Sequence, residues 1–159
     1  MNLESMYQEI ILDHYKHPHG RGLRDPFDAE SFQVNPTCGD EVTLRVKLDG
    51  DKVADISYEG QGCSISQASV SAMYEMVIGK TVPQALETGE HFMTLMQAKG
   101  DASVAEKLED ELEDAVAFAG VSKYPARIKC ALMSWMALKD ASARALSVAH
   151  PTTPSGAQA

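Results

Sequence analysis

Four side chains in this sequence have residue types and neighbours that suit a metal site. Cys38 and Asp40 are separated by one glycine in a predicted turn. Cys63 lies in a Gly-rich turn, and Cys130 lies near the start of a predicted last helix. Three thiolates and one carboxylate supply the four ligands that tetrahedral zinc requires, and thiolate-rich sites also hold iron–sulfur clusters. The residue types therefore predict that these four side chains bind one zinc ion or build an iron–sulfur cluster.

The spacing of the cysteines is less decisive than their types. The sequence contains no Cys-x-x-Cys pair, and the separations match no standard zinc finger. Three cysteines are an odd number and cannot all pair within the chain, while cysteines at the ends of elements are less typical of core filling. From residue types and positions alone, metal binding and three unrelated cysteines are equally supported.

Two strands joined by a hairpin are the clearest elements that would position these ligands. Apolar and polar residues alternate strictly over residues 42–49, which predicts a strand with one buried face. The Asp-Gly-Asp sequence that follows is a hairpin-turn signal. Residues 31–34 are predicted to form another strand. The residues expected to point inward on the returning strand are Ala54, Ile56 and Tyr58.

Helical patterns precede and follow the strands. The first is an amphipathic helix that ends before the His-Pro-His-Gly sequence at 17–20. A capping box of Ser64 and Gln67 predicts the start of a helix directly after Cys63. Two or three further helices are expected over residues 82–119, where one apolar stripe runs from 104 to 119, and a last helix is expected from about 126 to 147. The apolar face of the first helix is formed by Leu3, Met6, Tyr7, Ile10 and Ile11.

This order of elements predicts the fold class. Strands come first and helices after them, which favours an α+β domain with a small antiparallel sheet of about three strands packed against several α-helices. The length of 159 residues suits a single domain, which we expect to span residues 1–149. Residues 150–159 are small and polar with two prolines and are expected to form a disordered tail.

The charge and the N-terminal sequence exclude several function classes. A formal net charge of −9 disfavours binding to nucleic acid and to anionic membranes, because their phosphates would be repelled. The N-terminus has neither the basic start nor the apolar run of a signal peptide, and no apolar stretch approaches the ~20 residues of a membrane helix. We therefore expect a cytoplasmic protein that binds neither nucleic acid nor membrane.

Three segments resemble the ligand motifs of a known family. They are Asn-Pro-Thr-Cys-Gly-Asp at 35–40, Gly-Gln-Gly-Cys-Ser-Ile-Ser at 60–66 and Arg-Ile-Lys-Cys at 127–130. In this order they are similar to the motifs of the U-type iron–sulfur cluster assembly scaffold family, which comprises NifU N-terminal and IscU-like proteins. The segment from Tyr7 to Pro18 resembles the start of the same family, and the likeness covers roughly residues 3–147.

Within that family the chain resembles the SufU branch more than the IscU branch. Lys129 stands where IscU-type proteins carry a histidine, and the segment between Cys63 and Cys130 is longer than theirs. The resemblance implies a SufE/NifU-like fold and a zinc ion, or alternatively a transient iron–sulfur cluster. It also implies partners, namely a cysteine desulfurase of the SufS type and other SUF assembly proteins. The residues that it implies as metal ligands are Cys38, Asp40, Cys63 and Cys130.

The SufU-like role would be that of a zinc-bound acceptor of persulfide sulfur, a zinc-dependent sulfurtransferase. Cys38 is the expected acceptor because a glycine-flanked loop leaves it freer than the other two thiols. Arg127 precedes Cys130 by almost one helical turn and is a candidate for neutralising the surplus negative charge of the site, although an ordinary surface arginine fits equally well. Iron–sulfur cluster scaffolding uses the same residues. The alternative from a different functional class is a structural zinc-binding interaction domain whose cysteines are not reactive.

The histidines near the N-terminus form a second group with metal-binding residue types. His14 and His17 are three residues apart on the first helix, and His19 follows the proline that ends it. Because no cysteine or carboxylate is placed with them in the sequence, we do not expect a second metal site there.

Overall fold

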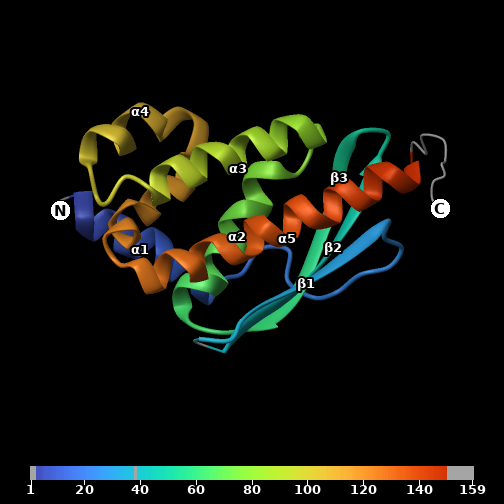
Figure 1. The fold of residues 1–159 in the computed structure, drawn as a ribbon, viewed down its shortest axis with the longest axis horizontal. Helices are drawn as coiled ribbons and strands as arrows, with labels where there is room; N and C mark the ends of the chain where they lie inside the picture. The colour runs from blue at the N-terminus through green and yellow to red at the C-terminus, as the bar shows by residue number, and fades with distance from the viewer. Residues whose placement is uncertain (1–2, 38, 150–159) are drawn as a thin grey trace.

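A three-stranded antiparallel sheet and a set of helices form the molecule (Figure 1). The structure is a computed structural model that describes residues 3–37 and 39–149. The strands are β1 (Ala29–Asn35), β2 (Asp40–Asp49) and β3 (Lys52–Gln61), in the spatial order β1-β2-β3. The helices are α1 (Leu3–Lys16), α2 (Ser64–Val77), α3 (Val82–Met96), α4 (Ala102–Leu112), the 3-10 helix η1 (Glu113–Lys123) and α5 (Pro125–Ala149). The predicted α+β class is confirmed.

The central strand β2 has the alternation expected from its sequence. Its apolar residues are buried and the residues between them are partly exposed, so one face points into the core. The helix α5 packs across that face, against both β1 and β2 (Figure 1). The buried apolar residues of β2 are Val42, Leu44, Val46 and Leu48.

The inward face of β3 differs from the expectation at Ala54. This residue is exposed, whereas its neighbour Val53 is fully buried. The cause is a register shift between Lys47 and Leu48, which pair with Asp55 and Val53 and so leave Ala54 unmatched. Because one unmatched residue moves every side chain on one side of it to the opposite face, strict alternation predicted the wrong inward residue at this end of the strand.

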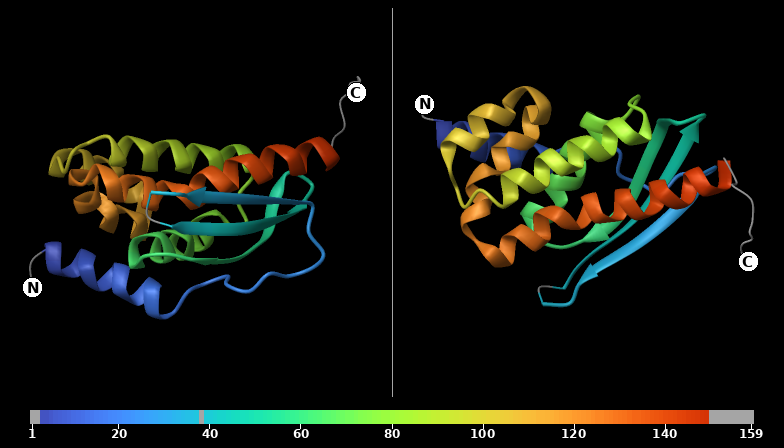
Figure 2. Two further views of the ribbon diagram at one scale, coloured as in Figure 1. Left: turned by 60° about the horizontal axis from the view of Figure 1, so that its bottom comes forward. Right: turned by 45° about the horizontal axis from the view of Figure 1, so that its top comes forward.

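The helices form a layer on one side of the sheet (Figure 2). Helix α2 packs against α1 and α5, while α3 and α4 pack against η1. Aromatic rings join this helical layer to α5, because Phe92 stacks on Trp135 with ring centroids 5.5 Å apart and meets Phe118 edge-on at 5.9 Å. The long segment between the second and third cysteines is therefore an integral part of the core.

Two helical predictions need correction. The apolar face expected for α1 is only partly covered, since Leu3 and Met6 are 51% and 45% exposed and the buried residue of α1 is His14. The apolar stripe over residues 104–119 does not belong to one regular helix. Instead, α4 ends at Leu112 and the 3-10 helix η1 begins at Glu113, which has a φ of 46°, so the stripe is divided between these two helices.

Other expectations are not tested by the described residues. The tail at 150–159 lies outside them, so its predicted disorder and the domain boundary at residue 149 stay predictions. None of the described helices combines the length and the hydrophobicity that crossing a bilayer requires.

Candidate metal centre

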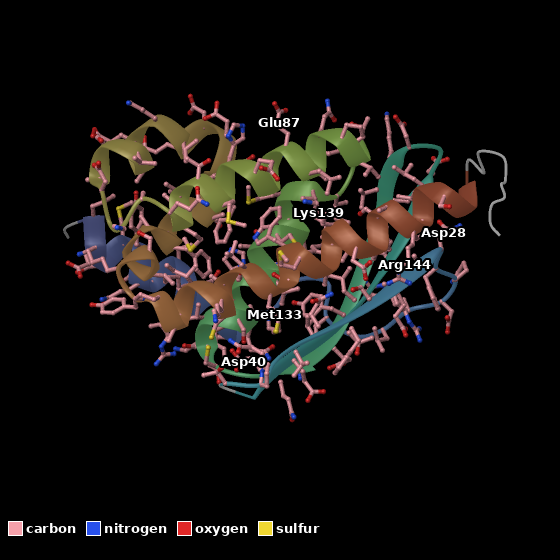
Figure 3. The ribbon with its side chains drawn as sticks, viewed as in Figure 1. Asp28, Asp40, Glu87, Met133, Lys139 and Arg144 are labelled. Carbon is pink, nitrogen blue, oxygen red and sulfur yellow. The ribbon has the colours of Figure 1, made fainter. Side chains whose placement is uncertain are left out.

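Strand pairing brings the first and second motifs to one end of the sheet. The strands β2 and β3 are antiparallel, so the start of β2 at Asp40 lies beside the end of β3, where α2 begins. Asp40 is 2% exposed, and Figure 3 shows it at this end of the sheet, near the start of α2. A buried carboxylate requires partners that offset the loss of hydration.

Those partners belong to Cys63. One carboxylate oxygen of Asp40, Oδ1, accepts a hydrogen bond of 3.1 Å from the backbone N–H of Cys63. The other, Oδ2, lies 3.5 Å from the Cys63 sulfur. Cys63 is also the N-cap residue of α2, and it makes no side-chain capping hydrogen bond. The predicted capping box of Ser64 and Gln67 is therefore wrong.

Cys130 reaches the same place from the other side. It lies in the second turn of α5, is 2% exposed, and its Sγ is 3.7 Å from the carbonyl oxygen of Ala126. One ligand atom from each of Asp40, Cys63 and Cys130 lies within 4.8 Å of the others. Three of the four predicted ligands thus converge, although they come from three separate elements.

Cys38, the fourth predicted ligand, lies outside the described residues. Its neighbours Thr37 and Gly39 belong to the turn that joins β1 to Asp40. The backbone N–H of Thr37 donates to the side-chain oxygen of Asn35 at 3.2 Å. The backbone N–H of Gly39 donates to the carbonyl oxygen of Asn35 at 2.8 Å. Thr37 and Gly39 are therefore both held by Asn35.

The convergent side chains fit a tetrahedral zinc ion. Zn–S and Zn–O bonds of about 2.3 and 2.0 Å give a sulfur–oxygen separation of about 3.5 Å in a tetrahedral site. The observed separation between Cys63 Sγ and Asp40 Oδ2 is 3.5 Å. Two thiolates and a carboxylate at these distances would repel one another, and a divalent cation between them removes that repulsion.

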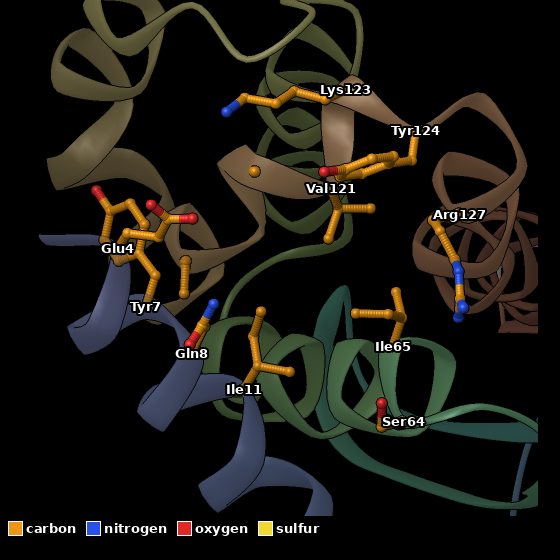
Figure 4. Close-up of a pocket in the computed structure, with 12 residues that line it drawn as sticks. Glu4, Tyr7, Gln8, Ile11, Ser64, Ile65, Val121, Lys123, Tyr124 and Arg127 are labelled. Carbon is orange, nitrogen blue, oxygen red and sulfur yellow. The ribbon is translucent and has the colours of Figure 1, made fainter.

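A pocket opens beside the centre (Figure 4). It has a volume of about 420 Å³ and lies between α1, the start of α2, η1 and the start of α5. Ser64 and Ile65, which directly follow Cys63, form part of its wall, and the exposed Arg127 lies at its edge. Sequence reasoning missed this pocket because its lining comes from four elements. Arg127, in the first turn of the helix that carries Cys130, thus lies at the edge of the pocket.

Comparison with protein families gives a direct match. The NifU-like N terminal domain family matches residues 6–131, which include Asp40, Cys63 and Cys130. This chain belongs to that family. The resemblance seen in the motifs is therefore confirmed.

Relatives of this NifU-like chain carry two different functional names. A protein of Bacillus subtilis named zinc-dependent sulfurtransferase SufU is 44% identical over 144 residues, which cover 90% of this chain and 93% of the relative. A protein of Streptococcus pyogenes named iron–sulfur cluster assembly scaffold protein IscU is 43% identical over 150 residues, which cover 94% and 91%. The two identities are nearly equal, so the names alone do not separate sulfur transfer from scaffolding.

A solved structure supports the fold of the NifU-like chain. It comes from Fervidobacterium islandicum and is described as a candidate iron–sulfur cluster assembly scaffold of the SUF system. It superposes with a TM-score of 0.75 and 36% sequence identity, over 89% of this chain and 99% of that one.

Proposed function

We propose that this protein acts in iron–sulfur cluster assembly of the SUF type, as a zinc-bound acceptor of persulfide sulfur from a cysteine desulfurase. The observation that carries the proposal is the convergence of Asp40, Cys63 and Cys130 within 4.8 Å, beside the turn that holds Cys38. The ligands would be these four residues. The relative named as a zinc-dependent sulfurtransferase supports both the metal and the activity.

The transfer is a thiol–persulfide exchange. The Cys38 thiolate attacks the terminal sulfur of the desulfurase persulfide, a new sulfur–sulfur bond forms, and the old bond breaks to release the desulfurase thiolate. No external oxidant or reductant is consumed, because one persulfide replaces another. Bound zinc supplies the chemistry that keeps the cysteine thiols deprotonated near neutral pH.

The positions of Cys63 and Cys130 favour Cys38 as the acceptor. Cys63 is the N-cap of α2, and Cys130 is buried in α5, which packs against α2 and the sheet. Moving either of these thiols would disturb a helix. Cys38 lies between β1 and β2 in the sequence, and Asp40, the first residue of β2, would retain the metal while the thiol reacts.

Cluster scaffolding is the second candidate function, supported by the name of the Streptococcus pyogenes relative. It would use the same four ligands, with an iron–sulfur cluster as the cargo. A purely structural zinc domain is the third reading. Structural zinc sites are built mainly from cysteine and histidine, so the carboxylate of Asp40 favours a site whose ligands exchange.

The partners follow from the chemistry of transfer. The donor would be a cysteine desulfurase, and we infer one of the SufS type because of the SufU relative, with other SUF assembly proteins receiving the sulfur. A cytoplasmic location fits this role, since reducing conditions keep the thiols free.

The decisive experiment measures alanine formation by a cysteine desulfurase of the SufS type with zinc-loaded protein. We expect strong acceleration by the wild type, loss of acceleration with Cys38→Ser, and a persulfide on Cys38 detected by mass spectrometry. Full acceleration by Cys38→Ser would overturn the assignment of the acceptor. A wild type that gives no acceleration but assembles a stable cluster from ferrous iron and sulfide would identify a scaffold instead.

A further inference from the structure

A second cluster of metal-ligating side chains lies apart from the cysteines. His14 from α1, His19 from the following loop and Glu75 from α2 each offer one ligand atom within 4.8 Å of the others. The carboxylate of Asp114, at the start of η1, is hydrogen-bonded to Nε2 of His14. Glu75 is twelve residues along α2 from Cys63, about 18 Å at the rise of an α-helix, so the two clusters are at opposite ends of this helix.

Ser71 contacts both histidines of this cluster. Its hydroxyl oxygen accepts a hydrogen bond of 2.9 Å from the backbone N–H of His19 and lies 2.8 Å from Nδ1 of His14. When Nδ1 carries the ring proton and donates it to Ser71, Nε2 of His14 presents its lone pair to a metal ion.

Nε2 of His14 faces two carboxylates. Asp114 Oδ2 lies 3.1 Å from Nε2, and Glu75 Oε1 lies 3.7 Å from it. A proton on Nε2 would satisfy His14 alone, but Nε2 of His19 also approaches Glu75, at 3.4 Å from Oε2. A cation between these groups would serve both imidazoles and the carboxylate of Glu75.

We propose that His14, His19 and Glu75 bind a divalent first-row transition-metal ion, with Asp114 beside the His14 ring. Bonds of about 2.0–2.1 Å to nitrogen and oxygen give ligand separations of about 3.3–3.4 Å in a tetrahedral site. The two measured separations between histidine nitrogens and Glu75 oxygens, 3.4 and 3.7 Å, lie at and slightly above this value. Imidazole and carboxylate donors suit such ions better than Mg²⁺ or Ca²⁺, which prefer oxygen ligands alone.

The burial of the four side chains also suits an ion that enters from solvent. His14 is 1% exposed and is held by Ser71, as the imidazole ligands of metal sites are held by a hydrogen bond to the other ring nitrogen. The side chains of His19, Glu75 and Asp114 are 39%, 44% and 54% exposed and form the open side. A bound ion would join α1, the loop after it and α2 at one point.

The test is a titration of zinc-loaded protein with Co²⁺, followed by absorption and by equilibrium dialysis. We expect one Co²⁺ per chain, with visible d–d bands and without the near-ultraviolet charge-transfer band of a cobalt–thiolate bond. His19→Gln and Glu75→Gln should each weaken Co²⁺ binding at least about 10-fold. These two variants carry the test because both residues are partly exposed, whereas substitution of the buried His14 threatens folding.

The matched control is His17→Gln. His17 lies on the same segment, its side chain is 73% exposed and it pairs with Asp13 outside the cluster, so Co²⁺ binding should be unchanged. Three results would overturn the proposal. They are an absence of Co²⁺ binding beyond the zinc site, unchanged Co²⁺ affinity in both cluster variants, and a thiolate charge-transfer band with release of zinc.

Discussion

Gly62 packs directly against the carboxylate of Asp40. A Cβ atom at this glycine would lie 2.6 Å from Asp40 Oδ1 and 2.6 Å from the hydroxyl oxygen of Ser66. The absence of a side chain at one position therefore permits the approach of the carboxylate to Cys63. This contact explains why the turn before α2 needs glycine next to the cysteine.

The first prediction concerns this contact. We expect Gly62→Ala to displace the Asp40 carboxylate and to weaken zinc binding at least about 10-fold, as measured by competition with a chromophoric chelator. Gly120→Ala is the matched control, because a Cβ there meets nothing within 4 Å. Equal zinc affinity in both variants would show that the carboxylate adapts or does not bind the metal.

Asp40→Asn should have opposite effects with and without metal. The amide oxygen retains the hydrogen bond from the Cys63 N–H but removes a negative charge that lies 3.5 Å from a thiol. We expect the free energy of unfolding of the metal-free protein to be unchanged or raised. With zinc in excess it should fall by about 1.4 kcal/mol for each tenfold loss of affinity. Urea unfolding with and without a chelator measures both values, and an equal loss in the two states would count against a metal-binding role for Asp40.

Arg127→Gln should slow sulfur transfer without changing zinc affinity. The guanidinium is exposed at the edge of the pocket, where it would act on an approaching partner rather than on the metal. We expect the difference between variant and wild type to shrink as salt screens the charge. Lys129→Gln, an exposed cation on the same turn of α5, is the control. Equal losses in the two variants would identify a general charge effect and leave Arg127 as a surface arginine.

The attachment of α5 to β1 should depend on pH. The hydrogen bond from Arg144, and to a smaller extent the one from Ser31, lowers the pKa of Asp140 below its ordinary value of 3.8. Because the folded pKa lies below the unfolded one, this carboxylate stabilises the protein above pH 3.8, and the stabilisation is lost as the pH falls through the folded pKa.

Asp140→Asn therefore should lower the free energy of unfolding at neutral pH, by less than about 1 kcal/mol because the side chains of Asp140 and Arg144 are about half exposed to solvent. The difference from the wild type should vanish at a pH well below 3.8. Asp110→Asn, at an exposed aspartate of α4, provides the comparison. A difference that persists undiminished in acid would assign the effect to packing instead of charge.

The sequence predicted the parts of the fold that follow from local periodicity. Alternation along β2 and the hairpin after it were enough to place the strands, because one buried face imposes a period of two. The exposure of Ala54 was not predictable in this way, since a single unmatched residue leaves no mark in the pattern of apolar residues. The division of the stripe at Glu113 was missed for a similar reason, because the apolar residues continue across it.

The two clusters show where sequence reasoning about sites succeeds and fails. The convergence of Asp40, Cys63 and Cys130 was expected from residue types together with a family resemblance, not from spacing. The histidine cluster was dismissed because the sequence places neither Glu75 nor Asp114 near it. The carboxylates of Glu75 and Asp114 arrive from other helices, through tertiary packing that no local pattern encodes.

The two anchored thiols of the cysteine centre are carried by helices that contact each other directly. Helix α2 holds Cys63 at its first turn and packs against α5, which holds Cys130. The chain between them runs through α3, α4 and η1, to one side of this contact (Figure 1). The relative position of the two thiols is therefore set by one helix–helix contact, while the inserted helices complete the core by covering Trp135. Loosening of that core would be transmitted to the distance between the two thiols.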